Sequence, residues 1–169
     1  ETVHTFTTEE LMIAKPKVRD SREPHLGLEA WADDGSTFWI HYHSGPSPQA
    51  FVKIDVESWT ITQYDVSDLT IPAEYALNPD TGRMAYSDCP AIYDAPAAEA
   101  FAESDQEVTL SVYDLDAGTG QDLATVVARH FNRESIAGRC FNPEWVDDRT
   151  VTYDGPGNEG RIATVVAEH

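Results

Sequence analysis

The chain has little positive charge. Its 169 residues include 11 Lys and Arg against 30 Asp and Glu, a formal net charge of −19, and only three of the basic residues are lysines. Such a surface repels phosphate groups, so the sequence excludes nucleic acid as a partner. An acidic, lysine-poor composition is typical of secreted proteins from high-GC bacteria and of proteins from salt-adapted organisms. Solubility through self-repulsion is the simpler explanation of the charge.

Long apolar runs are also missing. No stretch approaches the roughly 18 apolar residues of a membrane-spanning helix, and no charged-then-apolar leader precedes Glu1. We therefore expect no membrane span. The expected location is extracytoplasmic or secreted, after removal of a leader, and the alternative is the cytoplasm of a salt-adapted organism.

Known catalytic motifs are absent as well. The sequence contains no Gly-x-Ser-x-Gly elbow, no His-Glu-x-x-His, no phosphate-binding loop and no dinucleotide-binding glycine pattern. Carboxylates are so frequent that pairs arise by chance, and no pair stands in an apolar setting that would separate two pKa values. The sequence therefore favours a non-catalytic protein.

Cysteine is scarce, with two residues, Cys89 and Cys140. Each adjoins a predicted strand in neighbouring repeats. A disulfide between them would close a loop of about 52 residues, worth about 4 kcal/mol of stability. Such a bridge would favour an extracytoplasmic location. A pair of reduced, buried thiols is the alternative.

What the sequence does have is a local pattern that occurs three times. A polar turn built on Asp, Pro or Gly leads into a short apolar strand, and a loop then leads into a second strand. The three pairs of predicted strands are 38–42 with 51–56, 84–86 with 108–113, and 150–154 with 161–166. Repetition at this length indicates an array of β-units, because one unit cannot bury its own apolar faces. With 41% hydrophobic residues, the chain has enough apolar surface for one core.

The middle repeat carries a family resemblance. Residues 78–82 (Asn-Pro-Asp-Thr-Gly), residues 84–87 (Met-Ala-Tyr-Ser) and residues 112–115 (Val-Tyr-Asp-Leu) resemble a blade of the TolB-like or WD-type β-propellers. The resemblance covers about two thirds of the chain. It implies an all-β fold of antiparallel, blade-like sheets, in one domain with about three repeats. It leaves function open, because propellers serve as enzymes, lectins and adaptors alike.

The expected repeats span residues 25–70, 71–127 and 128–169, with residues 1–10 as an added strand. Three blades cannot close a circular propeller, which takes at least four. We therefore expect a partial propeller that belongs to a longer polypeptide, is completed by a partner chain, or pairs with itself into a six-bladed ring. The open sheet edges of such an array require a partner. A β-sandwich whose hairpins mimic blades is the alternative fold.

Propeller geometry predicts where the loops gather. The loop between the second and third strands of each repeat emerges on the same rim, so residues 43–50, 89–107 and 154–160 should share one face. Loops on a rigid scaffold often carry binding residues. The candidate binding residues on this face are His43, Tyr93, Asp94, Phe101, Asp154 and Asn158.

Because the candidate binding residues share this face, we expect the chain to be a non-catalytic scaffold that binds another protein or a glycan. Two alternatives remain open. The chain is the propeller part of a peptidase or glycan-active enzyme completed by another chain, or it is a structural subunit of an acidic surface assembly.

Two histidines provide the most specific local chemistry. In residues 39–43 (Trp-Ile-His-Tyr-His), strand alternation places Trp39, His41 and His43 on one face. Two imidazoles at this spacing can chelate a divalent metal, with a third ligand from Asp88, Asp94 or His130. A solvent-facing or hydrogen-bonded pair is the alternative. The expectation is therefore no cofactor, with a divalent metal at His41 and His43 as the alternative.

Residues 114–125 partly resemble a calcium loop. The sixth position is Thr119 instead of Gly, and the twelfth is Thr125 instead of a bidentate Glu. A tight turn between two outer strands, with Gly in the left-handed conformation, explains the segment better. Residues 121–131, which follow, fit a helix or a strand equally.

Overall fold

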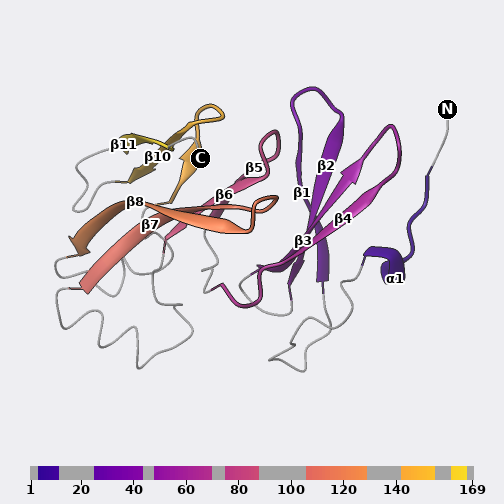
Figure 1. Ribbon diagram of the computed structural model, residues 1–169, viewed down its shortest axis with the longest axis horizontal. Helices are drawn as coiled ribbons and strands as arrows, with labels where there is room; N and C mark the ends of the chain where they lie inside the picture. Colours follow the sequence, from indigo (N-terminus) through magenta and orange to yellow (C-terminus); the bar gives the residue numbers. More distant parts are fainter. Residues whose placement is uncertain are drawn as a thin grey trace. The chain divides into compact units, whose positions relative to one another are not determined.

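The computed structural model describes residues 4–11, 25–43, 48–69, 75–87, 106–128, 142–154 and 161–166 (Figure 1). The chain divides into two compact units, Glu1–Leu69 and Thr70–His169. Cys89 and Cys140 lie outside the described residues, so the proposed disulfide stays a prediction.

The first unit holds one four-stranded antiparallel sheet. Its strands lie side by side in chain order: β1 (His25–Trp31), β2 (Thr37–His43), β3 (Pro48–Asp55) and β4 (Ile61–Asp65). The pairing places His41 opposite Phe51, and Phe51 opposite Tyr64. This simple meander from one edge to the other is the strand order of a propeller blade.

The second unit holds two sheets. One contains β5 (Tyr75–Asn78), β6 (Arg83–Ser87), β7 (Gln106–Asp114) and β8 (Thr119–Ala128) in chain order. The other contains β9 (Glu144–Trp145), β10 (Thr150–Asp154) and β11 (Arg161–Val165), also in chain order. In the described segments, each sheet consists of consecutive strands. The prediction of an all-β fold with antiparallel, blade-like sheets is confirmed.

The repeated turns are alike in atomic detail. In the first turn of each repeat, the side chain of an Asp or Asn accepts a hydrogen bond from the backbone N–H of the residue two positions later. The carboxylate of Asp34 accepts from Ser36 N at 2.8 Å, the amide oxygen of Asn78 accepts from Asp80 N at 3.0 Å, and Asp147 accepts from Arg149 N at 2.8 Å. Such Asx turns reverse the chain locally, which explains why this spacing of Asp and Asn recurs.

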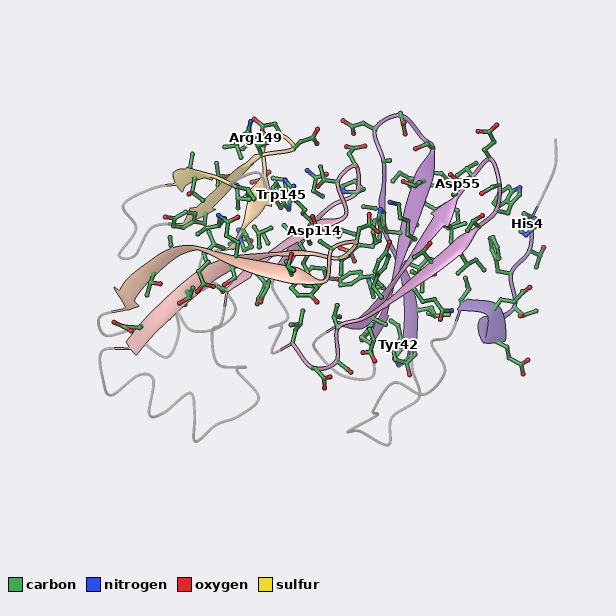
Figure 2. The ribbon with its side chains drawn as sticks, viewed as in Figure 1. His4, Tyr42, Asp55, Asp114, Trp145 and Arg149 are labelled. Atoms are coloured by element: carbon green, nitrogen blue, oxygen red, sulfur yellow. The ribbon has the colours of Figure 1, made fainter. Side chains whose placement is uncertain are left out.

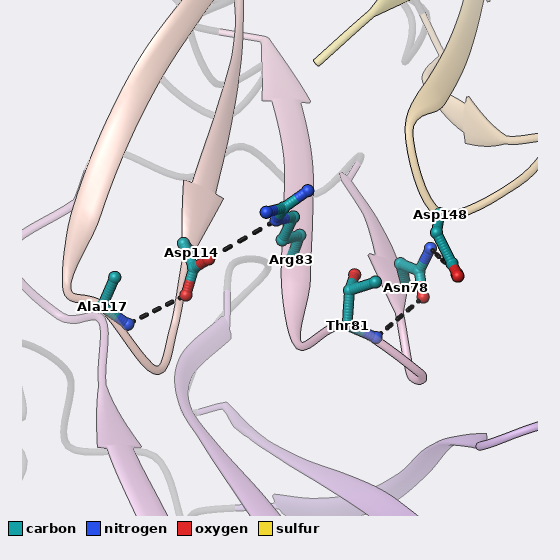
Figure 3. Close-up of polar contacts among 6 residues, drawn as sticks. All are labelled: Asn78, Thr81, Arg83, Asp114, Ala117 and Asp148. Carbon is teal, nitrogen blue, oxygen red and sulfur yellow. Dashed lines mark hydrogen bonds and ion pairs between the residues drawn. The ribbon is translucent and has the colours of Figure 1, made fainter. Parts of the chain in front are cut away.

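The outer hairpin between β7 and β8 forms as predicted. Gly118 has φ = 67°, and its N–H donates to Asp114 O at 2.9 Å. The carboxylate of Asp114 accepts from Ala117 N at 2.8 Å and faces Arg83 Nε at 3.4 Å (Figure 3). Residues 121–128 belong to β8, so the strand alternative for that segment is correct and the helix is wrong.

Each unit has its own apolar cluster. In the first, the buried residues Leu11, Val52 and Ile54 pack with Phe38 and Ile40, among others. In the second, one cluster joins the two sheets, and its buried members are Ala85, Val108, Leu110, Val112, Val151, Tyr153 and Val166. Packing of one sheet face on another is how such sheets bury their apolar residues.

The N-terminal segment differs from the prediction. The described residues 4–7 are not in a strand, and α1 (Thr8–Leu11) is a single helical turn. Glu10 accepts a hydrogen bond from Thr7 N at 2.7 Å, while Thr7 Oγ1 accepts one from Glu10 N at 3.3 Å, which is a capping box. Phe6 and Leu11 pack on the first sheet. An added strand was predicted over residues 1–10, but the cap at Thr7 and the burial of Leu11 favour a helical turn.

Within the described residues, no helix is long and apolar enough to cross a membrane.

Candidate functional site

Three histidines meet at one end of the first sheet. The pairing of β1 with β2 sets His25 opposite His43 and Gly27 opposite His41. The ring centroids of His41 and His43 are 5.2 Å apart, and those of His25 and His43 are 5.6 Å apart. We call these three side chains the imidazole cluster. The structure therefore brings together the predicted pair, and it adds His25, which the sequence did not indicate.

The cluster is at the end of the sheet that holds Tyr42, opposite to the end that holds Asp55 (Figure 2). His43 is the last residue of β2, immediately before residues 44–47, which connect to β3. Its position at a strand end agrees with the prediction that His43 borders a connecting loop. Because all three rings start from paired strands, backbone hydrogen bonds limit how far they can move apart.

Glu29 orients His41. Its Oε2 lies 2.5 Å from Nδ1 of His41, and the two side chains are 18% and 24% exposed. A carboxylate at this place accepts the Nδ1–H of a neutral imidazole, or pairs with the charged ring. In the neutral ring, the lone pair then lies on Nε2. The contact with Glu29 thus fixes the orientation of the His41 ring.

Gly27 makes room for the His41 ring. A Cβ added to Gly27 would lie 2.6 Å from Nε2 and 2.8 Å from Cε1 of His41. No side chain tolerates such a contact without displacement of the ring. The ring of His41 therefore lies directly over the backbone of β1. Only a glycine at the paired position on β1 leaves room for the ring there.

Aromatic residues continue this face of the sheet. Trp39 and Phe51 are fully buried, and Trp39 stacks on Tyr64 with centroids 5.6 Å apart. Lys53 Nζ lies 5.4 Å from the centre of the Trp39 ring, a cation–π distance. The imidazole cluster therefore adjoins a buried aromatic layer, which makes its base rigid.

A second surface feature lies further along β1. Leu28 is 62% exposed and Trp31 is 50% exposed, and the Trp31 ring lies 4.8 Å from that of Phe38. β1 is an edge of its sheet in the part of the chain that the structure describes. Exposed aromatic side chains on an edge strand are suited to contact a partner. The sequence did not indicate either residue as a contact, because an apolar residue in a strand does not show which face of the sheet is covered.

The turn carboxylates show lowered pKa values. Hydrogen bonds from the side chain and amide of Ser36 hold the pKa of Asp34 below its usual value, and those of Ser58 do the same for Asp55. The amide of Arg149 lowers the pKa of Asp147. Hydrogen bonds that favour the ionised form explain these shifts, so these groups are parts of turns and not proton donors at neutral pH.

Metal ligation is not preformed. In the described segments, no group of three or more His, Cys, Asp or Glu side chains stands arranged to hold a metal ion. The candidate third ligands Asp88, Asp94 and His130 lie outside the described residues. The prediction of a metal at His41 and His43 therefore stays a prediction.

The other predicted binding residues are described in part or not at all. Asp154 is the last residue of β10. Tyr93, Asp94, Phe101 and Asn158 lie outside the described residues. The prediction that three loops gather on one face remains a prediction, since it depends on these segments.

Comparisons with known proteins do not identify a family for this chain. No family model matches the chain, and no curated protein has a similar sequence. A solved structure of an oligogalacturonate lyase in complex with manganese aligns with a TM-score of 0.48 and 19% identity, over 88% of this chain and 37% of that one. The chain thus spans little more than a third of that protein's length. A TM-score below 0.5 supports no statement about activity or ligands, so the fold class rests on the three sheets themselves.

Proposed function

We propose that the chain is a non-catalytic, extracytoplasmic β-scaffold that binds a protein or a glycan at the imidazole end of its first sheet. The observation that carries this proposal is the convergence of His25, His41 and His43 from two paired strands, beside the connection between β2 and β3. Binding residues are commonly found where loops leave a rigid scaffold.

The chemistry of the site suits both classes of partner. Imidazoles donate and accept hydrogen bonds, which sugar hydroxyls and peptide groups both require. The exposed rings of His25 and Trp31 lie on the same edge strand. Aromatic rings of this kind supply much of the contact energy at binding sites. His25 lies opposite His43 and Trp31 lies opposite Phe38, so the two rings face opposite sides of the sheet. A ligand at the imidazole cluster would contact His25, and Trp31 would serve a contact on the other face.

A binding comparison tests this proposal. The full chain is first screened against a glycan array and a peptide library. The strongest ligand is then titrated against the wild type, the double variant His41→Ala/His43→Ala and the control variant His4→Ala. His4 is in the same unit but stacks on Trp59, at 4.4 Å between centroids, outside the imidazole cluster. We expect the double variant to bind at least about tenfold more weakly, a loss of about 1.4 kcal/mol. Equal affinity in all three proteins would place the binding site elsewhere.

One contact favours a second function. The pair of Glu29 and His41 is the arrangement that prepares an imidazole for general-base catalysis, because the carboxylate orients the ring and stabilises its charged form. The chain would then be the propeller part of a peptidase or glycan-active enzyme completed by another chain. A screen of peptides and polysaccharides for turnover tests this function. Turnover that is lost in Glu29→Gln would support it.

The association state separates the remaining possibilities. Native mass spectrometry of the protein from its source distinguishes a closed homodimer, a complex with another chain and a large assembly. A homodimer agrees with a self-completed ring, and a co-purifying chain agrees with an enzyme component. A mass that increases with concentration supports the structural subunit of an acidic surface assembly.

A further inference from the structure

We propose that an apolar patch on β1 and β2 is a docking surface for a short basic, amphipathic segment of a partner protein. The apolar patch consists of Leu28, Trp31 and Phe38. The pairing of Leu28 with Ile40 and of Trp31 with Phe38 sets these side chains on the face of the first sheet opposite to the imidazole cluster. The inference therefore goes beyond the proposed function and does not depend on it.

Exposure distinguishes the apolar patch from the rest of the first unit. Among the described residues of this unit, Leu28 and Trp31 are the large apolar side chains that stand well exposed. Both belong to the same edge strand, and the centroid of the Trp31 ring lies 4.8 Å from that of Phe38. Adjoining exposed apolar side chains often mark a contact with a partner, and tryptophan is among the residues that contribute most to binding energy.

The apolar patch continues a contact that this face already makes. Phe6 and Leu11 of the N-terminal segment pack in the apolar cluster that also includes Phe38. Because Phe38 belongs to that cluster and also contacts Trp31, the patch extends the covered part of the face toward β1. One short segment with two apolar anchors is thus already seated on this face. A second segment of the same kind would lie beside it on the patch.

A segment bound here would use side chains instead of a new strand pairing. The register between β1 and β2 shifts between Leu28 and Ala30, which makes Glu29 a β-bulge. A bulge in an edge strand interrupts the row of backbone groups with which another strand would pair. The side chain of Glu29 contacts His41 on the other face of the sheet, so the patch itself stays apolar.

Negative charge beside the apolar patch selects a basic partner. Asp33 and Asp34 directly follow β1, in the turn to β2, and both are exposed. A 2.8 Å backbone hydrogen bond from Val56 N to Ser36 O brings the turn after β3, with the exposed Glu57, to the same end of the sheet. Hydrogen bonds from Ser36 lower the pKa of Asp34, so this carboxylate is ionised at neutral pH.

This charge is not balanced on the same face. In the part of the first unit that the structure describes, Lys53 is the single lysine or arginine, and it lies over Trp39 on the other face. An arginine of the partner would stack on Trp31 and pair with a turn carboxylate. A second copy of this chain fits less well, because two chains with a formal charge of −19 repel each other.

Peptide binding to the full chain tests the inference. The probe is a short, fluorescently labelled peptide in which arginine alternates with leucine around a central tryptophan. One matched peptide has glutamate in place of arginine, and another keeps the arginines but has serine in place of the apolar residues. By fluorescence anisotropy at physiological ionic strength, we expect both matched peptides to bind at least about tenfold more weakly than the probe. If the serine peptide binds as tightly as the probe, the contact is charge attraction alone and the inference is wrong.

Variants of the apolar side chains locate the contact. Trp31→Ser and Leu28→Ser should each weaken binding of the probe at least about tenfold. Val146→Ser is the matched control, because Val146 is 63% exposed but lies in the second unit. Thermal unfolding shows whether each variant folds, and Leu28→Ser decides the question if Trp31→Ser does not fold. Wild-type affinity of folded Leu28→Ser for the probe would overturn the inference.

A charge variant tests the choice of a basic partner. Asp34→Asn keeps an acceptor for the turn amide but removes the charge, and it should weaken binding of the probe about two- to fivefold. Asp116→Asn is the control, since it makes the same change in net charge at an exposed turn of the second unit. Equal effects of the two variants would mean that the charge beside the patch does not select the partner.

The apolar patch and the imidazole cluster are tested separately. The double variant His41→Ala/His43→Ala should bind the probe as the wild type does. If it loses the probe while Leu28→Ser retains it, the patch inference fails and the proposed function stands. If the probe binds at the patch but no screened ligand requires His41 and His43, the proposed function fails and the patch stands. A dimer in native mass spectrometry that Trp31→Ser dissociates would show that a second copy covers the patch, which would overturn the choice of partner.

Discussion

Trp145 and Ala76, which are far apart in the sequence, join two successive repeats. The indole Nε1 of Trp145 donates a 2.9 Å hydrogen bond to the carbonyl oxygen of Ala76, 69 residues earlier. This bond connects β9, the two-residue first strand of the last sheet, to β5, the first strand of the preceding sheet. A two-residue strand makes few ladder hydrogen bonds, so this side-chain bond adds to the apolar cluster that joins the last sheet to the preceding one.

Trp145→Phe tests this dependence. Phenylalanine keeps most of the ring but cannot donate, so the carbonyl of Ala76 loses its partner. We expect a loss of about 0.5–1.5 kcal/mol of unfolding free energy, measured by urea denaturation. Trp31→Phe is the matched control, because Trp31 is half exposed and lies in the other unit. The control should stay within about 0.5 kcal/mol of the wild type. Equal losses of unfolding free energy in Trp145→Phe and Trp31→Phe would mean that the hydrogen bond to Ala76 does not stabilise the fold.

Asn78 supports the same junction from the turn after β5. It is 5% exposed, and its side-chain oxygen accepts from Asp80 N at 3.0 Å and from Thr81 N at 3.1 Å. Its Nδ2 also lies 3.5 Å from both Asp147 O and Asp148 Oδ1, at the limit of a hydrogen bond (Figure 3). One buried side chain thus serves the turns of two successive repeats.

Two substitutions separate these roles. Asn78→Ala leaves the part-buried amides of Asp80 and Thr81 without their acceptor and should cost about 1–3 kcal/mol, measured by urea denaturation. Asn78→Asp keeps an acceptor for both amides but loses the donor and brings a second negative charge toward Asp148. It should retain the turn and therefore cost less than Asn78→Ala. A larger loss for Asn78→Asp would show that the contact with the last repeat is the more important one.

Asp147 should contribute stability that depends on pH. Its pKa in the folded protein is lowered, chiefly by the hydrogen bond from the amide of Arg149, so the unfolded chain binds a proton more readily. The contribution is therefore complete above the unfolded pKa of about 3.9, and it is lost as pH falls through the folded pKa.

The comparison of wild type with Asp147→Asn measures this pH-dependent contribution to stability. By calorimetry, the wild type should have the higher Tm at pH 7, because an ionised acceptor binds the turn amides more strongly than a neutral one. The difference should shrink below about pH 4. Repetition in 1 M NaCl is the control, since salt screens the general repulsion of the acidic chain but not this local hydrogen bond. A difference in Tm that stays constant down to pH 2.5 would contradict the assignment.

Gly27→Ala should displace His41 without unfolding the sheet. The new methyl group would lie 2.6 Å from Nε2 of His41, so the ring must rotate away from β1. We expect weaker partner binding, with a small change in Tm. Gly120→Ala is the control, since its Cβ would meet Tyr113 at an ordinary 3.5 Å. If Gly27→Ala binds as the wild type does, the position of His41 is not required for binding.

Much of the local structure could be predicted from the sequence. The Asx turns at Asp34 and Asp147 and the glycine turn at Gly118 depend on residues within a few positions of one another. Side-chain alternation along a single strand likewise placed His41 and His43 on one face. These features follow from local backbone geometry, which a sequence pattern describes directly.

The candidate site required the tertiary structure. His25 lies opposite His43, and Glu29 reaches His41, because of the register between β1 and β2. Register depends on which apolar faces are buried against other elements, and a shift of one residue would turn each side chain to the opposite face. The N-terminal turn shows the same limit, since packing of Phe6 and Leu11 on the first sheet accompanies a helical turn where a strand was predicted over residues 1–10.

The sequence by itself therefore determined the repeats, the turns, the strand pattern and the acidic surface, all of which depend on neighbouring residues or on composition. Only the tertiary structure decided that three histidines and a glutamate meet at one end of the first sheet, and that Trp145 joins two repeats. The physical reason is that contacts between distant segments depend on how strands pair and pack, which no single segment specifies.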